Sequence, residues 1–259
     1  MISGNDRIAV ALSGGKDSTA LLLLLNEILL EKVGTTLVAI TIDEGIAGYR
    51  DETILSAARL ARDLGIEHRI ITFRDLFGKD LDEILVGRVK RACSICGILR
   101  RKALSSAAKD AGADKIATGH NLDDEAQSVL MNVFRGDLTR LVRYSGSGAR
   151  DCFLPRIKPL MGISEKEIAV YLMVKGHYPE LPDCPYTKYA LRAEIRTYLN
   201  ILESVHHGTM RNLVEGNGNL RWELNGISPG GEIARCRECG EPCSGTLCQT
   251  CLLIKRLLG

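Results

Sequence analysis

The stretch Ser13-Gly14-Gly15-Lys16-Asp17-Ser18 decides the fold of the chain's first half. A short apolar run before it predicts a buried strand, and a longer apolar run after it predicts a helix. Two adjacent glycines let the backbone turn tightly and present successive N–H groups to an anion, and the positive end of the following helix points to the same place. The serine hydroxyls and the lysine ammonium add further donors. The hexapeptide therefore predicts a phosphate-binding loop between a strand and a helix.

Strand-like and helix-like segments alternate along the rest of the chain. The residue patterns predict strands over 7–12, 37–42, 68–72 and 115–118. They predict helices over 18–30, 51–64, 97–111, 121–134, 164–175 and 189–202. This order predicts a Rossmann-like α/β fold, in which helices cover both faces of a parallel sheet.

Length and composition predict three units. A chain of 259 residues can bury one α/β core and still carry a small appendage. We expect a main domain over 1–205, a linker rich in glycine and asparagine over 206–231, and a cysteine-rich module over 232–259.

The overall composition excludes some classes of partner. With 45% hydrophobic and 25% charged residues, the chain is ordinary for a globular protein. Its net charge of +2 gives no argument for a nucleic-acid partner, which would need a local basic patch. The sequence shows neither a signal peptide nor a membrane-spanning run, so we expect a cytoplasmic protein with no membrane partner. In that compartment, nine cysteines indicate metal or redox chemistry rather than disulfides.

Five of the cysteines lie in the last two dozen residues. The pairs Cys236-x-x-Cys239 and Cys248-x-x-Cys251 have the ligand type and spacing of a tetrahedral zinc site. The segment is too short to fold by burial alone, so a bound metal would supply its folding free energy. Cys243 is a fifth cysteine, which we interpret as a spare thiol or an alternate ligand.

Four further cysteines precede the tail: Cys152, and three that could act together, namely the pair Cys93-Ser-Ile-Cys96, just before a predicted helix, and the distant Cys184. If these three converge, they could hold an iron–sulfur cluster with one open iron, hold zinc with an open position, or act as a persulfide carrier and a resolving thiol. Alternatively, their role is structural: Cys93 and Cys96 would simply begin the helix, and Cys184 would be an inert buried thiol. Nearby basic residues favour thiolate character: Arg88, Lys90, Arg91, Arg100 and Arg101.

The acidic stretch GHNLDDE at 119–125 follows a predicted strand and opens a helix. Asn121 can cap that helix, and carboxylates in a first turn suit the helix dipole. Asp124 could instead hold Mg²⁺ or orient a substrate, because ligands of open α/β sheets bind at the carboxyl ends of strands. For His120 a structural role and a functional role remain equally open.

Taken together, these motifs resemble a known family. The hexapeptide lacks the Walker A pattern G-x-x-x-x-G-K-[ST] and resembles the PP-loop of ATP pyrophosphatases, which bind ATP, adenylate a substrate and release pyrophosphate. With CSIC at 93–96, GHNLDDE at 119–125, NVFRGD at 132–137, DCPY at 183–186 and the tail CRECGEP…LCQTC, the chain resembles the TtcA/TtuA group of tRNA 2-thiolation enzymes. Within that group it most resembles the archaeal NcsA and eukaryotic cytosolic branch, which thiolates the wobble uridine.

The resemblance implies two sets of site residues. One is a [4Fe–4S] cluster held by Cys93, Cys96 and Cys184, with the fourth iron free. The other is a set of ATP contacts from Ala11, Ser13, Gly14, Gly15, Lys16, Asp17, Ser18, Ile42, Gly119 and Asp124. Arg100 matches a position that is basic in the family and lies near the phosphates.

The resemblance also implies a reaction. ATP, with Mg²⁺, would adenylate the C2 oxygen of a uridine, and a sulfide held on the cluster would replace that oxygen as AMP leaves. The expected partners are tRNA, sulfide or a ubiquitin-like sulfur-carrier protein, and a second copy of the chain. Family members usually carry an N-terminal zinc module, whereas here Met1-Ile2-Ser3-Gly4 leads into the first strand.

A local basic patch is the expected surface for tRNA. Six residues between the GHNLDDE helix and the second half of the domain supply it: Arg135, Arg140, Arg143, Arg150, Arg156 and Lys158. A solvated charged face with no partner explains these residues equally well.

Four other functions stay open from the sequence. T-loop uridine 2-thiolation of the TtuA type shares the SGGKDS, CSIC, GHNLDDE and DCPY motifs, whereas the tail and the Arg-Gly-Asp at 135–137 point to the wobble branch. A cluster-free thiolase would carry sulfur as a persulfide on Cys93 or Cys184. Another PP-loop adenylating ligase, such as a lysidine synthetase-like or amidotransferase-type enzyme, would need ATP but not three converging cysteines. A non-catalytic zinc adaptor would bind RNA and use ATP only as a structural ligand.

Overall fold

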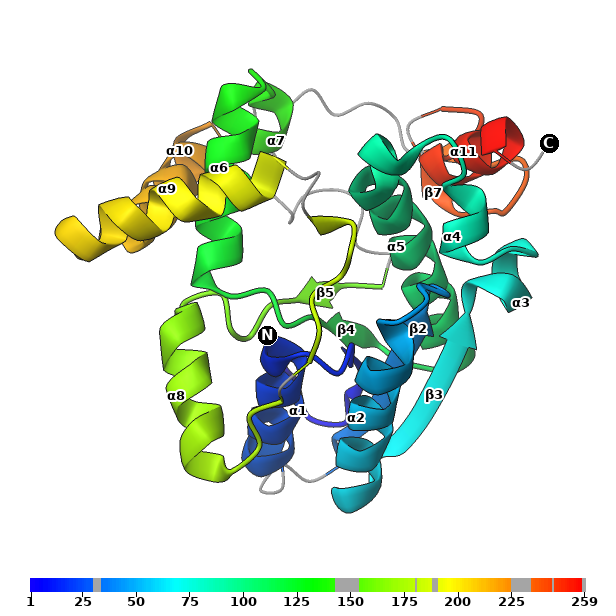
Figure 1. The fold of residues 1–259 in the computed structure, drawn as a ribbon, viewed down its shortest axis with the longest axis horizontal. Coiled ribbons are helices and arrows are strands. Elements are labelled where there is room, and N and C mark those ends of the chain that lie inside the picture. The colour runs from blue at the N-terminus through cyan, green and yellow to red at the C-terminus, as the bar shows by residue number, and fades with distance from the viewer. Residues whose placement is uncertain are drawn as a thin grey trace.

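A five-stranded parallel sheet forms the centre of the computed structural model, with strand order β3-β2-β1-β4-β5 (Figure 1). The structure describes residues 1–29, 34–142, 154–179, 181–187, 191–224, 234–243 and 245–257. The strands are β1 (Arg7–Ala11), β2 (Thr36–Asp43), β3 (Glu67–Thr72), β4 (Lys115–Ala117) and β5 (Arg156–Ile157). The first four confirm the predicted strands, whereas β5 has only two residues and carries no pattern that could predict it.

Successive side chains of β1 point alternately into two layers of the core. Ile8 and Val10 pack into one apolar cluster and Ala9 into the other, because successive side chains of a strand point to opposite faces of the sheet. Both faces are therefore buried, which is why the strands read as nearly continuous apolar runs. The predicted α/β fold with a covered parallel sheet is confirmed.

Helices cover each face. On the Ile8 face lie α1 (Lys16–Leu29), α2 (Arg50–Asp63) and α8 (Glu165–Lys175). On the Ala9 face lie α3 (Phe73–Phe77), α4 (Leu81–Ile84) and α5 (Ala92–Asp110), the last preceded by the 3₁₀ helix η1 (Val89–Arg91). Among the described residues, no helix has both the length and the apolar character needed to cross a bilayer.

A separate helical group stands beside the sheet. It comprises α6 (Leu122–Phe134), α7 (Leu138–Val142), α9 (Leu191–Val205) and α10 (Thr209–Glu223), which lie together in Figure 1. Its small core joins α6, α9 and α10 through Leu122, Ala126, Ile195, Leu199 and Met210.

Helix α10 shows that the prediction of a linker over 206–231 was wrong for Thr209–Glu223. Glycine and asparagine weaken a helix in isolation, and their density suggested a flexible segment. Tertiary packing outweighs that propensity, because Met210 is buried against α6 and α9. The buried amide of Asn217 donates a hydrogen bond to the carbonyl of Leu141 at 3.2 Å, which fixes α10 on α7.

The cysteine-rich tail packs on α5. It forms a two-stranded antiparallel ribbon, β6 (Ala234–Arg235) and β7 (Pro242–Cys243), followed by α11 (Gln249–Leu257). Leu253, Ile254 and Leu257 of α11 pack against the core cluster that includes α5, and Lys109 of α5 forms an ion pair with Glu241. The tail therefore supports the helix that carries Cys93 and Cys96.

Two apolar side chains of α1, one buried and one exposed, give a matched test of this packing. Leu21 is 0% exposed in the core, whereas Ile28 on the same helix is 56% exposed. We expect Leu21→Ala to lower the free energy of unfolding by about 2–5 kcal/mol, because it leaves a cavity in a close-packed layer. Ile28→Ala is expected to change it by less than about 0.5 kcal/mol. Urea unfolding of both variants measures the difference, and equal effects would contradict the assigned layer.

Candidate active site

The predicted phosphate-binding loop connects β1 to α1. Gly14 adopts a φ of +90°, which L side chains rarely reach, and a Cβ there would lie 2.0 Å from the carbonyl oxygen of Thr53 in α2. The hydroxyls of Ser13 and Ser18 are 3.1 Å apart, and Ser18 donates to the carbonyl of Gly15 at 2.9 Å. The loop is thus held from within and pressed against α2, so its backbone geometry is fixed before a ligand binds.

Lys16 supplies a permanent cation at this loop. Its ammonium lies 2.9 Å from a carboxylate oxygen of Asp17 and 2.9 Å from one of Glu165 at the start of α8. Partial burial disfavours the charged form, but the hydrogen bond to Glu165 and the charge of Asp17 outweigh it and hold the pKa of Lys16 above its usual value. Glu165 also pairs with Arg196 of α9. These acidic and basic partners were not predicted, because only tertiary folding brings α8 and α9 to the loop.

The acidic stretch after β4 meets the loop at close range. A Cβ on Gly119 would lie 3.0 Å from the backbone carbon and oxygen of Asp17, so the two backbones approach closely. Asn121 donates its amide hydrogen to Asp17 at 3.1 Å and caps α6 by accepting from the N–H of Asp124 at 2.9 Å. The carboxylate of Asp124 also lies 3.0 Å from the guanidinium of Arg192. One oxygen of Asp124 therefore serves the helix cap, and the other pairs with Arg192.

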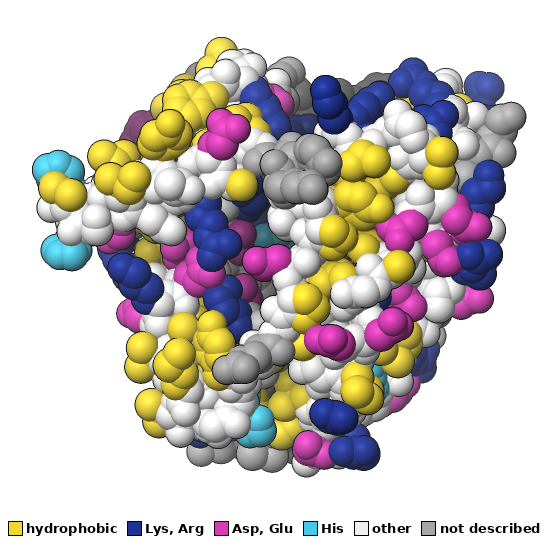
Figure 2. Space-filling model, viewed as in Figure 1, with side chains coloured by type: hydrophobic (Ala, Val, Ile, Leu, Met, Phe, Trp, Pro, Cys, Tyr) yellow, Lys and Arg dark blue, Asp and Glu magenta, His cyan; other side chains and the backbone are white. Residues whose placement is uncertain are grey.

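These residues surround a pocket of about 300 Å³. In Figure 2 the middle of the molecule is hollowed, with acidic and basic side chains around the hollow. The lining joins the loop, the GHNLDDE stretch, the DCPY segment, α8 and α9: Lys16, Asp17, Asn121, Asp123, Asp124, Gln127, Glu165, Asp183, Thr187, Arg192, Ala193 and Arg196. Of the residues expected to bind ATP, the lining contains Lys16, Asp17 and Asp124. Ala11 is the last residue of β1, and Ile42 is the last but one of the neighbouring β2.

The cysteines of the CSIC motif lie in the first turns of α5, which begins at Ala92 and not, as predicted, after the motif. The helix starts earlier because Ala92 and Ile95 are buried against the core. The thiol of Cys93 faces the carbonyl of Tyr186 at 3.7 Å, so the segment that carries Cys184 lies beside this pair. Burial raises the pKa of Cys96 to about 12 and also raises the pKa of Cys184, so both thiols keep their protons at neutral pH unless a metal displaces them.

The two cysteine groups differ in how closely their ligand atoms lie. Within the part of the chain that the structure describes, the only group of metal-binding side chains whose ligand atoms all lie within 4.8 Å of one another is the C-terminal one. Cys93, Cys96 and Cys184 are not such a group. Each thiolate of a [4Fe–4S] cluster binds a different iron, so the ligands of a cluster need not lie as close together as those of a single ion.

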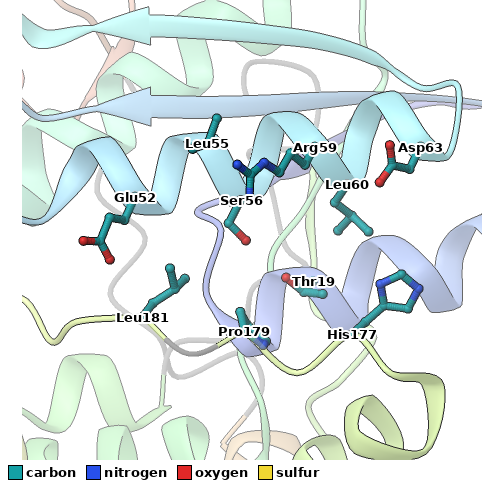
Figure 3. Close-up of a pocket in the computed structure, with 10 residues that line it drawn as sticks. All are labelled: Thr19, Glu52, Leu55, Ser56, Arg59, Leu60, Asp63, His177, Pro179 and Leu181. Carbon is teal, nitrogen blue, oxygen red and sulfur yellow. The ribbon is translucent and has the colours of Figure 1, made fainter.

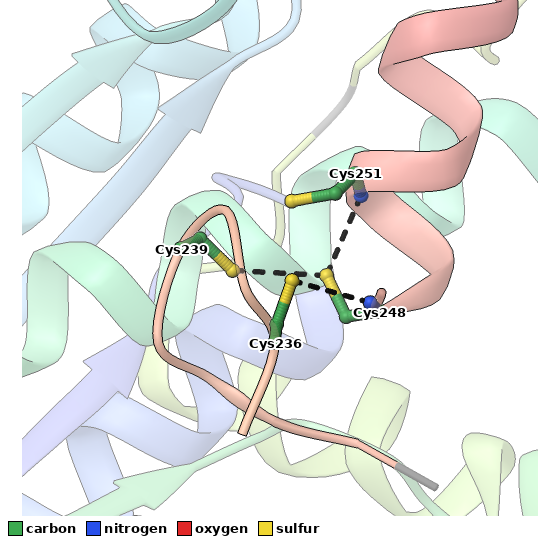
Figure 4. A group of neighbouring side chains, drawn as sticks. All are labelled: Cys236, Cys239, Cys248 and Cys251. Carbon is green, nitrogen blue, oxygen red and sulfur yellow. Dashed lines mark hydrogen bonds between the residues drawn. The ribbon is translucent and has the colours of Figure 1, made fainter. Parts of the chain in front are cut away.

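The C-terminal cysteines form a compact tetrad (Figure 4). The sulfurs of Cys239 and Cys248 are 3.7 Å apart, close to the separation of about 3.8 Å that a tetrahedral ion with sulfur ligands at about 2.3 Å requires. The N–H of Cys248 donates to the sulfur of Cys236 at 3.3 Å and lowers the pKa of that thiol to about 6. Cys243 lies outside the tetrad, and its thiol donates to the carbonyl of Gly245 at 2.9 Å. The prediction that these four cysteines come together is confirmed, because their sulfur atoms all lie within 4.8 Å of one another.

A second pocket, of about 400 Å³, lies between α1, α2 and the segment after α8 (Figure 3). Its walls include Thr19, Ser56, Arg59, His177 and Leu181. None of the residues expected at the active site lines it, so we do not assign the reaction to it.

The expected basic patch is partly neutralised. Lys158 lies 2.6 Å from Glu125, Arg140 lies 3.1 Å from Asp137, and Arg156 donates to the carbonyl of Arg101 at 3.1 Å. Burial and the neighbouring Arg100 and Arg140 lower the pKa of Arg101, which marks a group of positive charges contributed by α5 and α7. Arg135 lies exposed at the end of α6, whereas Arg143, Arg150 and Cys152 lie outside the described residues.

The fold and the loop together define a class of protein. A doubly wound parallel sheet with the SGGKDS loop after β1 and an acidic stretch after the adjacent β4 is the arrangement of PP-loop ATP-binding proteins. The ATP_bind_3 family, described as a PP-loop domain, matches residues 2–200, and the chain belongs to this family. The predicted membership is thereby confirmed.

Individual relatives are similar over most of their length. The tRNA 2-thiolation protein NcsA of Haloferax volcanii is 38% identical over 262 residues, which cover 96% of this chain and 81% of the relative. The cytoplasmic tRNA 2-thiolation protein 1 of Drosophila melanogaster is 38% identical over 263 residues, which cover 97% and 74%. The solved structure of the U34-tRNA thiolase NcsA from Methanococcus maripaludis with its [4Fe-4S] cluster superposes with a TM-score of 0.84 at 35% identity, covering 98% of this chain and 82% of that one.

Two glycines allow a test of the loop. We expect Gly14→Ala to weaken binding of a non-hydrolysable ATP analogue by about tenfold or more, because the new Cβ meets a backbone oxygen and the φ of +90° is strained. Gly162→Ala is the matched control, because its Cβ would meet nothing within 4 Å. Isothermal titration calorimetry compares the two, and unaltered binding by Gly14→Ala would show that the loop does not hold the nucleotide.

Proposed function

We propose that this protein is an ATP-dependent tRNA sulfurtransferase that replaces the C2 oxygen of the wobble uridine with sulfur. One observation carries the proposal: the loop residues Lys16 and Asp17, the acidic Asp124, and Asp183 next to Cys184 all line one pocket at the carboxyl edge of the sheet. Similarity to NcsA proteins over nearly the whole chain supports the same substrate class.

The loop serves the first half of the reaction. Its N–H groups and the Lys16 ammonium bind the phosphates of ATP, while the C2 oxygen of uridine attacks the α-phosphorus and pyrophosphate leaves. Lys16 stabilises the negative charge that builds up on the departing pyrophosphate. Oxygens of Asp17 and Asp124 are the ligands that Mg²⁺ prefers, and both face the pocket. The product is an adenylated uridine whose C2 has AMP as a good leaving group.

The three cysteines near the pocket serve the second half. Cys93, Cys96 and Cys184 fit a [4Fe–4S] cluster, which when bound supplies an open iron site for the sulfur that replaces the oxygen. The chain fixes the geometry: buried Ile95 and Leu99 hold the first turns of α5 on the core. The hydroxyl of Thr187 donates to the carbonyl of Cys184 at 2.8 Å, which holds Cys184 between two residues of the pocket lining. Positioning of the sulfur beside C2 is then the main contribution to the rate.

The partners follow from the surface. The positive charges around Arg101, Arg140 and Arg156 bind tRNA phosphates without reading sequence. A second copy of the chain covers the apolar face of α9, where Tyr198, Ile201 and Val205 are exposed. Sulfide or a ubiquitin-like carrier provides the sulfur, and the reaction takes place in the cytoplasm, as the names of the eukaryotic relatives indicate for those proteins.

The deciding experiment is an anaerobic assay. Protein reconstituted with iron and sulfide is incubated with ATP, sulfide and bulk tRNA. Mass spectrometry then identifies the modified nucleosides and, from tRNA fragments, their positions. We expect 2-thiouridine at the wobble position only when ATP is present, and light scattering of the same sample checks for a dimer. Thiouridine in the T-loop would assign the protein to the TtuA-type reaction. Full activity without iron would favour the persulfide route.

Two variants assign roles in that assay. Cys96→Ser is expected to abolish thiolation, because it removes one of the three cluster ligands. Asp124→Asn keeps an oxygen that can cap α6 but loses the charge, so we expect a fall on the order of a hundredfold in rate with an unchanged melting temperature. Cys243→Ser, outside both cysteine groups, serves as the control and should retain activity.

The C-terminal tetrad is predicted to bind one zinc ion per chain. Cys239→Ser should lose that ion and lower the melting temperature, because bound metal supplies the folding free energy of the tail that braces α5. Cys243→Ser should keep it, because its thiol lies outside the tetrad. Mass spectrometry of metal content after purification measures both. Loss of iron rather than zinc in Cys239→Ser would instead assign the cluster to the tetrad.

A further inference from the structure

An ion pair between Glu44 and Arg50 is buried beside the phosphate-binding loop. Glu44 directly follows β2 and Arg50 is the first residue of α2, and each side chain is only 4% exposed. The guanidinium Nε lies 2.8 Å from the carboxylate Oε2. Neither residue lines the pocket or belongs to the motifs that identify the family, so neither has been given a role above.

The remaining nitrogens of Arg50 tie three segments together. Nη1 donates to the carbonyl of Ser13 in the loop at 3.3 Å and to the hydroxyl of Thr53 at 2.8 Å. Nη2 donates to the carbonyl of Ile42 at the end of β2. Thr53 is also the residue whose carbonyl would block a Cβ on Gly14. One guanidinium therefore fixes the loop, the strand end and the first turn of α2.

Glu44 extends this connection toward the cysteines. Its second oxygen, Oε1, lies 3.6 Å from the guanidinium of Arg100, which stands one turn after Cys96 on α5. The side chain of Arg100 is 56% exposed, so Glu44 is a fixed anchor for a residue that otherwise reaches into solvent. A single buried carboxylate thus faces Arg50 on the nucleotide side and Arg100 on the cysteine side.

Stability alone is a poor explanation of this arrangement. A buried ion pair loses so much hydration that apolar residues of the same volume often stabilise a fold equally well. The planar guanidinium, by contrast, offers five N–H donors in a rigid fork, so it can hold several acceptors at fixed positions at once. The contribution specific to the pair is therefore geometric.

We propose that Glu44 and Arg50 are positioning residues that couple the phosphate-binding loop to the cysteine-bearing helix. Arg50 holds the loop backbone in the conformation that receives phosphates, and Glu44 holds both Arg50 and Arg100. The expected effect on thiolation rests on the proposed function. The expected effect on the loop backbone concerns the protein without substrate and does not depend on that function.

The first test uses Arg50→Lys with Arg62→Lys as the matched control. Lysine keeps the charge but cannot reach the carboxylate, Ser13 and Ile42 together. Arg62 lies on the same helix, and its side chain is 75% exposed. We expect Arg50→Lys to raise hydrogen exchange of the 12–18 peptide at least about threefold and the Kd of an ATP analogue about tenfold. Arg62→Lys should change neither, and the α9 peptide should be unaffected in both variants.

Two milder variants keep the test decisive if Arg50→Lys unfolds. Thr53→Val removes one acceptor of Arg50 and does not touch Arg100, so we expect weaker ATP binding, about threefold, with normal thiolation at saturating ATP. Glu44→Gln keeps the shape but loses the charge that faces Arg100, so we expect weaker binding and also a thiolation rate at saturating ATP that falls about tenfold. A structural defect alone would not separate the two variants in this way.

The outcomes separate this proposal from the proposed function. If the wild-type protein neither binds ATP nor thiolates tRNA, the proposed function fails, and the exchange of the 12–18 peptide still decides the role of Arg50. If exchange of that peptide is unchanged in folded Arg50→Lys and Thr53→Val, the loop half of the proposal is overturned. Equal thiolation rates of Glu44→Gln and Thr53→Val at saturating ATP would overturn the proposal that Glu44 acts through Arg100.

Discussion

The adjacency of β1 and β4 in the parallel sheet is the constraint from which the site follows. The strands pair in register from Ile8 opposite Lys115 to Val10 opposite Ala117, so their carboxyl ends open at the same edge. Chain connections leave these two strands in opposite directions, which produces the crevice where ligands of doubly wound sheets bind. The close approach of Gly119 to Asp17 is the direct result: a Cβ at Gly119 would lie only 3.0 Å from the backbone of the loop.

Helix α5 connects the two cysteine-bearing regions of the chain. Its first turns carry Cys93 and Cys96, and the helix packs against α11 while Lys109 near its end pairs with Glu241 of the tail. A compact four-cysteine tetrad therefore supports the helix that carries two of the three other cysteines expected at the active site.

Local patterns predicted the elements well where a long apolar run or a cap was present. Four strands and six helices lie close to their expected positions, and Gly65 and Gly112 adopt the positive φ typical of residues that end helices. The failures have a common cause. Helix α10 has weak intrinsic propensity and depends on burial of Met210, and α5 begins early because Ala92 meets the core. Neither contact is encoded within a short window of sequence.

Residue types at fixed spacing were enough to predict the class of fold, the phosphate-binding loop, the tetrad of cysteines and the family. Tertiary structure alone decided which charges surround Lys16, where Cys184 lies relative to Cys93, and that a buried Glu44 faces both Arg50 and Arg100. The physical reason is that spacing along a chain fixes contacts only over a few residues, whereas a buried charge finds its partner wherever packing brings an opposite charge within reach.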